Sequence, residues 1–295
     1  MKKLSLFIAV CLMLNLSCSK KAMEEEPGSN EKKVKLSFAV AAAPELEGQI
    51  GIAEAPLSSL IKQLTFVIYR DGLNTEVARQ TQLSVDPLFG QLSFELPIGE
   101  YKVVAIGSKA EFGINKFYRN NEIPVILPFS AANMEYWQPN STMGDKHYKT
   151  DDTFFGKRSI TVGSGTSQQV IVQLKRIVGK LEVIVEDVET FTLDVDNEAT
   201  GYMFDSEKSF GIIDNDQFQI TNENGPISLY ILRTDQPLRI ELSIGTNLSS
   251  RRELTVPIYK NKRTIVKGNL FTPIPHSFSV SIDDQWLPDT AVVDF

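Results

Sequence analysis

Few residues of this 295-residue chain have the chemistry that catalysis or metal binding requires. The two histidines, His147 and His276, are far apart and have no neighbouring ligands at metal-binding spacing. Gly163-Ser164-Gly165 is typical of a turn and does not form a G-x-S-x-G nucleophile elbow. We therefore predict no enzyme activity, no catalytic residue, no cofactor and no metal site. A pair of carboxylates from distant strands, as in glycosidases, is the alternative that the sequence leaves open.

Two acidic clusters could be mistaken for calcium loops. Asp194-Val195-Asp196-Asn197-Glu198 resembles the start of an EF-hand loop, but Ala199 stands where that loop needs glycine. Asp214-Asn215-Asp216 has no matching continuation. We expect both clusters to be solvated loops.

The position of one cysteine predicts a covalent modification. Lys2 and Lys3 precede an apolar stretch over residues 4–16, which is the layout of a secretory signal peptide. The stretch is shorter than the roughly 20 apolar residues of a membrane-spanning helix. Leu16-Ser17-Cys18 resembles the lipobox of bacterial lipoproteins, in which the cysteine thiol takes diacylglycerol and the preceding bond is cut. We predict a signal peptide over residues 1–17 and lipidation of Cys18; a plain secretory signal is the alternative.

The segment after Cys18 has the composition of a tether. Cys11 lies in the predicted signal peptide, so the mature chain keeps one cysteine and no disulfide. Residues 18–33 are charged and contain Pro27 and Gly28, which predicts a flexible linker. Glu24-Glu25-Glu26 resembles the acidic signal that directs lipoproteins of the Bacteroidetes to the cell surface, although a solvated linker explains it equally well. The expected location is the outer membrane, lipid-anchored and surface-exposed.

The charge balance limits the possible partners. The formal net charge is −7, and loss of Lys2 and Lys3 with the signal peptide would make it more negative. Nucleic acid and anionic lipid surfaces are recognised by clustered Lys and Arg, so neither is an expected partner. No second apolar run approaches membrane-spanning length, so the lipid is the only membrane attachment we predict.

Alternation of apolar and polar residues dominates the rest of the chain and predicts half-buried β-strands. The alternating or β-rich runs are residues 34–40, 64–69, 92–98, 101–106, 160–162, 227–232, 238–244, 254–258, 264–266 and 278–282. Turn signals such as Asp71-Gly72 separate them, and no capped amphipathic helix of three turns is evident. Many short strands with such turns predict an all-β protein built from β-sandwiches.

A change of apolar face indicates a domain boundary. Val170, Val172 and Leu174 are apolar at even positions, whereas Leu181 and Val183 are apolar at odd positions. A strand whose inward side changes by one residue must bulge or pass from one core to another. Because the change falls at Arg176, we predict an N-terminal sandwich over residues 34–176 and a C-terminal sandwich over residues 177–295. A bulge inside a single domain is the alternative.

Residues 118–155 show little alternation and are rich in proline and aromatic residues. Long loops are often functional, and an exposed platform of Trp137 with Tyr136, Tyr148 or Phe129 could bind a sugar. Aromatic residues that cover the edge of a sheet are the commoner outcome, and burial of this cluster would count against sugar binding.

Several motifs together resemble the fimbrillin-type (type V) pilus lipoproteins of the Bacteroidetes. Leu96-Pro97-Ile98-Gly99-Glu100-Tyr101 resembles the family's "L-P-x-G-x-Y" entry into a strand. The segments 152–156 and 172–183 resemble the family's "D-x-F-x-G … L-x-R-x-x-A-K-x-x-V" connection between domains, with Gly179 in place of the usual alanine. Residues 256–268 resemble the strand-turn-strand unit that closes the second domain.

The resemblance implies two tandem transthyretin-like β-sandwiches, other fimbrial subunits as partners, and a role as an anchor or minor subunit assembling by strand complementation. In this family an arginine-specific protease removes the first strand of stalk subunits. Here the first arginine after Cys18 is Arg70, so we expect the strand at residues 34–40 to be retained. The competing hypothesis is a glycan-binding surface lipoprotein of a polysaccharide-uptake system.

The C-terminal tail carries two further signals. Asp289-Thr290-Ala291 resembles the short O-glycosylation acceptor of this bacterial group. Trp286, Leu287 and the run Ala291-Val292-Val293 could donate a strand to a neighbour or pack on their own domain.

Overall fold

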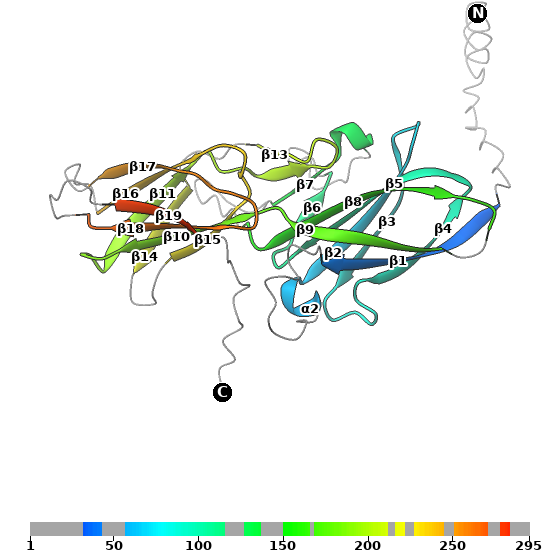
Figure 1. The fold of residues 1–295 in the computed structure, drawn as a ribbon, viewed down its shortest axis with the longest axis horizontal. Coiled ribbons are helices and arrows are strands. Elements are labelled where there is room, and N and C mark those ends of the chain that lie inside the picture. The colour runs from blue at the N-terminus through cyan, green and yellow to red at the C-terminus, as the bar shows by residue number, and fades with distance from the viewer. Residues whose placement is uncertain are drawn as a thin grey trace, which may run out of the picture. The chain divides into compact units, whose positions relative to one another are not determined.

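The computed structural model describes residues 32–42, 57–115, 127–136, 150–165, 168–211, 216–221, 227–244, 251–270 and 278–283. Strands dominate these residues, which confirms the predicted all-β class (Figure 1). Short helical segments are α2 (Leu57–Leu60) and η1 (Phe129–Ala131). The described residues from Lys33 onward form one compact unit.

A seven-stranded sheet forms the N-terminal part of this unit. Its strands, in spatial order, are β3 (Thr75–Leu83), β2 (Gln63–Arg70), β5 (Gly99–Ser108), β8 (Thr153–Val162), β9 (Gln169–Arg176), β1 (Lys33–Ala42) and β4 (Gln91–Pro97). β8 and β9 pair only at Phe154↔Arg176 and Phe155↔Lys175. Beyond that point the sheet separates into two halves, β3-β2-β5-β8 and β9-β1-β4, which enclose the first hydrophobic core between them.

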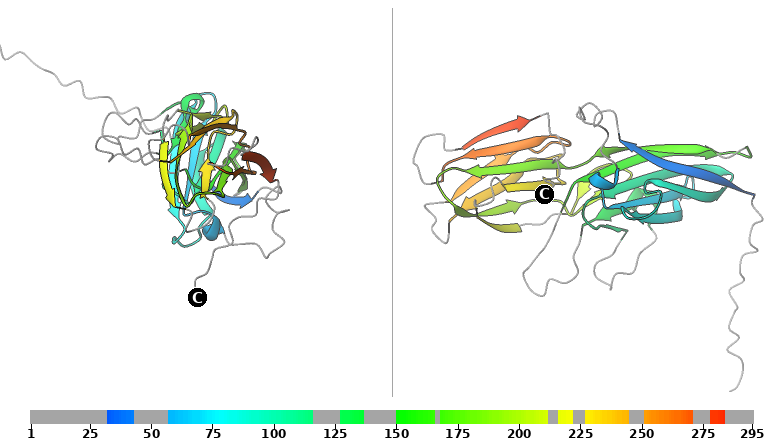
Figure 2. Two further views of the ribbon diagram at one scale, coloured as in Figure 1. Left: turned by 90° about the vertical axis from the view of Figure 1, so that its left-hand side faces the viewer. Right: turned by 90° about the horizontal axis from the view of Figure 1, so that it is seen from below.

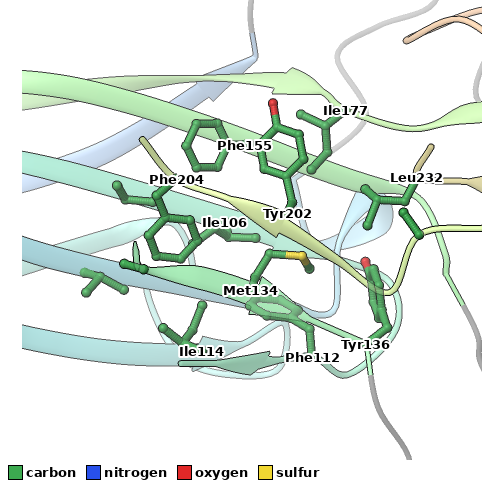
Figure 3. Packing of buried hydrophobic residues seen from close by; sticks show 14 of the residues in the cluster. Ile106, Phe112, Ile114, Met134, Tyr136, Phe155, Ile177, Tyr202, Phe204 and Leu232 are labelled. Atoms are coloured by element: carbon green, nitrogen blue, oxygen red, sulfur yellow. The ribbon is translucent and has the colours of Figure 1, made fainter. Parts of the chain in front are cut away.

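In the β3-β2-β5-β8 half of the sheet, β2, most of β5 and the start of β8 are buried on both faces. Along β2, Phe66 and Ile68 lie in the first core, whereas Val67 and Tyr69 lie in a second core on the opposite face. This explains why β2 is a continuous apolar run rather than an alternating one. The second core is covered by a small sheet of β13 (Ser209–Phe210), β12 (Gly201–Met203), β7 (Asn133–Glu135) and β6 (Gly113–Ile114). Figure 3 shows its side chains.

The C-terminal part is a sandwich of two four-stranded sheets around a third core. The first sheet has the order β15 (Ile227–Ile231), β10 (Gly179–Val185), β18 (Arg263–Gly268) and β19 (Phe278–Asp283). The second has the order β14 (Asp216–Thr221), β11 (Thr190–Asp196), β16 (Leu238–Ser243) and β17 (Arg252–Val256).

The predicted change of face at Arg176 is confirmed. Val170, Val172 and Leu174 of β9 pack in the first core, whereas Leu181 and Val183 of β10 pack in the third. The division into domains 34–176 and 177–295 stays a prediction. Residues 201–210 follow that boundary in sequence, yet β12 pairs with β7 and completes a layer over the N-terminal sheet.

Candidate functional site

The residues considered for catalysis or metal binding do not assemble a site in the part of the chain that the structure describes. His147 and His276 lie outside the described residues. Ser164 lies in an exposed turn after β8. In the described ranges, no group of three or more His, Cys, Asp or Glu is arranged to hold a metal ion.

The expectation of a solvated loop at residues 194–198 is wrong. β11 continues to Asp196 and pairs with both β14 and β16, and Val195 is buried in the third core. Glu198 is also buried, and its carboxylate accepts a hydrogen bond of 2.8 Å from the Leu232 backbone N–H. The acidic residues of β11 are the outward positions of a strand, and they masked its alternation. Most of the second cluster, residues 214–216, lies outside the described residues.

The described part of the aromatic cluster is buried. Phe129 and Tyr136 are each 2% exposed, and the Tyr136 hydroxyl hydrogen-bonds to Ser108 Oγ at 2.6 Å. Trp137 and Tyr148 lie outside the described residues. Since Phe129 and Tyr136 present no open ring to a sugar, their burial favours the fimbrial hypothesis over the glycan-binding one.

Cys18, the signal peptide, residues 18–31 of the tether and the tail after Asp283 lie outside the described residues, and Lys33, the last residue of the predicted tether, already belongs to β1. Among the described residues, no helix is long and apolar enough to cross a membrane. Lipidation of Cys18 and glycosylation at Asp289-Thr290-Ala291 therefore stay predictions.

The best candidate for a functional element is the N-terminal strand β1. It lies inside the seven-stranded sheet, antiparallel to β4 on one side and parallel to β9 on the other. Figure 2 shows β1, in blue, beside the green β9. A first strand that occupies an interior position closes a groove between β4 and β9 that the rest of the fold would leave open.

The side chains of β1 contribute strongly to the first core. Leu36 and Phe38 are each 1% exposed, and the alternate residues Lys35 and Ser37 are exposed. The Phe38 ring makes edge-on contacts with Phe66 at 6.2 Å and with Phe94 at 5.4 Å between ring centroids. The apolar residues of β1 therefore all face the first core. This fixes the register of β1 against its neighbours, because a shift of one residue would expose both Leu36 and Phe38.

A buried polar network holds the connection between β9 and β10. Arg176 continues the inward face of β9, and its guanidinium binds the carboxylate of Asp152. Its Nη1 donates to Asn261 Oδ1 at 2.8 Å. Asn261 has a φ of 57°, which asparagine tolerates better than most residues, and its backbone N–H donates to the Val178 carbonyl. Arg176 thus connects the N-terminal sheet to the β17–β18 turn.

Glycine is required at the start of β10. A Cβ at Gly179 would lie 2.5 Å from Ile258 Cγ2 and 2.6 Å from the Tyr259 carbonyl oxygen. The β17–β18 turn therefore packs directly on the backbone at the position where the resembled family has alanine.

Residues 23–287 match the protein family described as fimbrillin-A associated anchor proteins Mfa1 and Mfa2. A search of curated proteins gives no match.

Solved structures with the same fold cover nearly the whole chain. The fimbrial anchor protein Mfa2 from Porphyromonas gingivalis is 8% identical, with 85% of this chain and 98% of that chain covered and a TM-score of 0.53. A protein described as a candidate adhesin from Bacteroides ovatus is 12% identical, with 88% and 96% covered and a TM-score of 0.53. A protein described as a candidate polysaccharide-binding protein from Bacteroides thetaiotaomicron is 10% identical, with 86% and 97% covered and a TM-score of 0.53. At these identities the likeness shows the shared fold alone.

Proposed function

The chain belongs to the family of fimbrillin-A associated anchor proteins, and from this membership we propose that it is a lipid-anchored anchor or accessory subunit of a surface fimbria. The family is a structural class, which agrees with the prediction that the chain is not an enzyme. The observation that carries the proposal is the interior position of β1 in the seven-stranded sheet.

An intact β1 suits an end position in a polymer. Strand addition requires an open groove whose backbone groups and side-chain pockets accept a strand from a neighbour. Because β1 pairs with both β4 and β9 and its Leu36 and Phe38 are buried in the first core, that groove is already filled by the chain itself. A subunit in this state cannot accept a neighbour's strand there and would sit at the base of the fimbria.

The sequence before Arg70 supports retention of β1. No arginine lies between Cys18 and Tyr69, so an arginine-specific protease has no site on the N-terminal side of β1 or within it. Cleavage after Arg70 would also remove β2, whose Phe66 and Val67 are completely buried in two cores. A retained β1 keeps Cys18, and therefore the lipid, covalently joined to the folded body.

N-terminal sequencing of the protein recovered from assembled fimbriae tests the proposal. We expect the mature chain to begin at Cys18, whose thiol carries the lipid. A start beyond residue 40 would show that β1 is removed, and would make this a polymerising subunit.

The lipid anchor has its own test with a matched control. Cys18→Ala should abolish labelling by a fatty-acid analogue and release the protein from the outer membrane. Cys11→Ala removes the other cysteine, which we place in the signal peptide, and should leave labelling unchanged. Label that persists on Cys18→Ala would contradict lipidation at this residue.

A further inference from the structure

A groove of about 990 Å³ lies beside the connection between β9 and β10, on a different side of β9 from the β1 strand. Strands β8 and β9, the β12–β13 segment and the β17–β18 turn form its walls. Its charged lining residues are Lys157, Arg158, Lys175, Arg176, Lys260 and Glu207.

The groove opens because β8 and β9 separate. A Cβ at Gly156 would lie 2.3 Å from the Gln173 carbonyl oxygen, so the two backbones are in contact at that point. The last pair in their ladder is Phe155↔Lys175. Farther along, the Arg158 side chain spans the gap between the strands, and its Nη1 donates to the Ile171 carbonyl oxygen of β9 at 2.7 Å. Two strand edges therefore border the groove.

The lining is cationic although the chain as a whole is acidic. Five of its residues are Lys or Arg and one is Glu, in a chain of net charge −7. Asp152 balances Arg176, and Glu207 lies 2.9 Å from the Lys157 ammonium. With these two carboxylates counted, basic groups still outnumber acidic ones, and Arg158 and Lys175 are exposed on the rim of the groove.

The aromatic residues of the groove offer no open face to a sugar ring. Tyr202 is 1% exposed, and its ring lies 5.2 Å from that of Phe155 with an interplanar angle of 60°. The Lys260 ammonium lies 5.1 Å from the Tyr202 ring centroid and 3.1 Å from its hydroxyl. This packing favours a peptide over a saccharide as the occupant.

We propose that this groove binds an extended, acidic peptide segment of a partner protein. The segment lies extended along β8 and β9, and Arg158 and Lys175 pair with its carboxylates. This inference goes beyond the anchoring role and does not depend on lipidation or on retention of β1. Its test uses the purified protein, so its failure is distinguishable from failure of the proposed function.

Fluorescence anisotropy of labelled peptides tests the proposal on the full chain in detergent. The probe is a peptide of about ten residues that alternates glutamate with threonine, and the matched probe has lysine in place of glutamate. We expect only the glutamate peptide to bind, with an affinity that falls several-fold from about 50 to about 300 mM salt.

Charge reversals locate the binding to the groove. Arg158→Glu and Lys175→Glu should each weaken binding of the glutamate peptide by about tenfold, because attraction becomes repulsion. Lys267→Glu on β18 makes the same change of charge outside the groove and should stay within about twofold of the wild type. Thermal unfolding of each variant checks that the fold is intact.

Three results would overturn the proposal. The first is equal binding of the two peptides, and the second is equal weakening by Lys267→Glu. The third is tighter binding of polygalacturonate than of the glutamate peptide, which would make an anionic glycan the ligand.

Discussion

The guanidinium of Arg176 meets the carboxylate of Asp152 through two hydrogen bonds, Nε–Oδ1 at 2.7 Å and Nη2–Oδ2 at 2.8 Å. Both side chains are 2% exposed. Asp152 precedes β8 and Arg176 ends β9, so this ion pair joins the two strands at the point where the seven-stranded sheet separates.

Removal of one partner should be strongly destabilising. Arg176→Ala leaves the Asp152 carboxylate buried without its counter-charge, and we expect the free energy of unfolding to fall by about 3–5 kcal/mol. Urea denaturation measures the change. Arg239→Ala is the control, because Arg239 is 60% exposed in its pair with Asp196 and should cost less than about 1 kcal/mol. Equal decreases in the free energy of unfolding of the two variants would show that burial does not make the Arg176–Asp152 pair more important for stability than an exposed pair.

The contribution of β1 is testable at Phe38. Phe38→Ala removes a ring that is 1% exposed and contacts two other rings, and should lower the free energy of unfolding by about 3–5 kcal/mol. Lys35→Ala changes an exposed residue of the same strand and should stay within about 0.5 kcal/mol. A small effect of Phe38→Ala in chemical denaturation would mean that β1 detaches from the sheet at little cost.

Glycine at position 179 should be required in this chain despite the alanine of the resembled family. Gly179→Ala brings a methyl group against Ile258 and the Tyr259 carbonyl, and should cost about 1–3 kcal/mol. Gly163→Ala places a methyl group where no atom lies within 4 Å, and should change stability by less than about 1 kcal/mol. Equal melting temperatures for the two variants would refute the packing argument.

Glu135 should make stability depend on pH. It is 8% exposed on β7, paired with Gly201 of β12 and Gly113 of β6, and Oε2 has no hydrogen-bond partner among the described residues. Burial raises the pKa of Glu135 to about 7. A folded-state pKa above the unfolded value favours the protonated form, so its stabilisation is present below about pH 4.5 and is lost as the pH rises to about 7.

Glu135→Gln tests this dependence. The amide cannot ionise, so the variant should lose less stability than the wild type between about pH 5 and about pH 8, by an amount on the order of 2 kcal/mol. Glu95→Gln removes the same charge from an exposed position of β4 and controls for net charge. Parallel stability profiles of wild type and Glu135→Gln would rule out an effect of this carboxyl group.

Alternation made the class of fold predictable, because a half-buried strand must place every second side chain in the core. The runs at residues 34–40 and 238–244 correspond to β1 and β16, with Phe38 and Ile240 buried as the pattern requires. The change of face at Arg176 could also be predicted from the sequence, because it depends only on the residues of one continuous segment.

The sequence did not predict every strand, nor how deeply each predicted strand is buried. β11 was missed because Asp194 and Asp196, which flank Val195, make the end of the strand resemble a loop. At the edge strand β19 the alternation was present, yet Val280 and Ile282 are 43% and 42% exposed. An alternating pattern specifies which side chains share a face, but not how completely another element covers that face.

The sequence by itself determined the strands with strong alternation, such as β1 and β16, and the passage from one core to another at Arg176, because each depends on residues close together in the chain. Only the tertiary structure decided the partners of those strands. β12 comes after the change of face yet pairs with β7, and Asp152 finds Arg176 across 24 positions of sequence. The interior position of β1 and the cationic groove arise in the same way, because hydrogen-bond ladders and buried ion pairs join segments whose separation in sequence leaves no local signal.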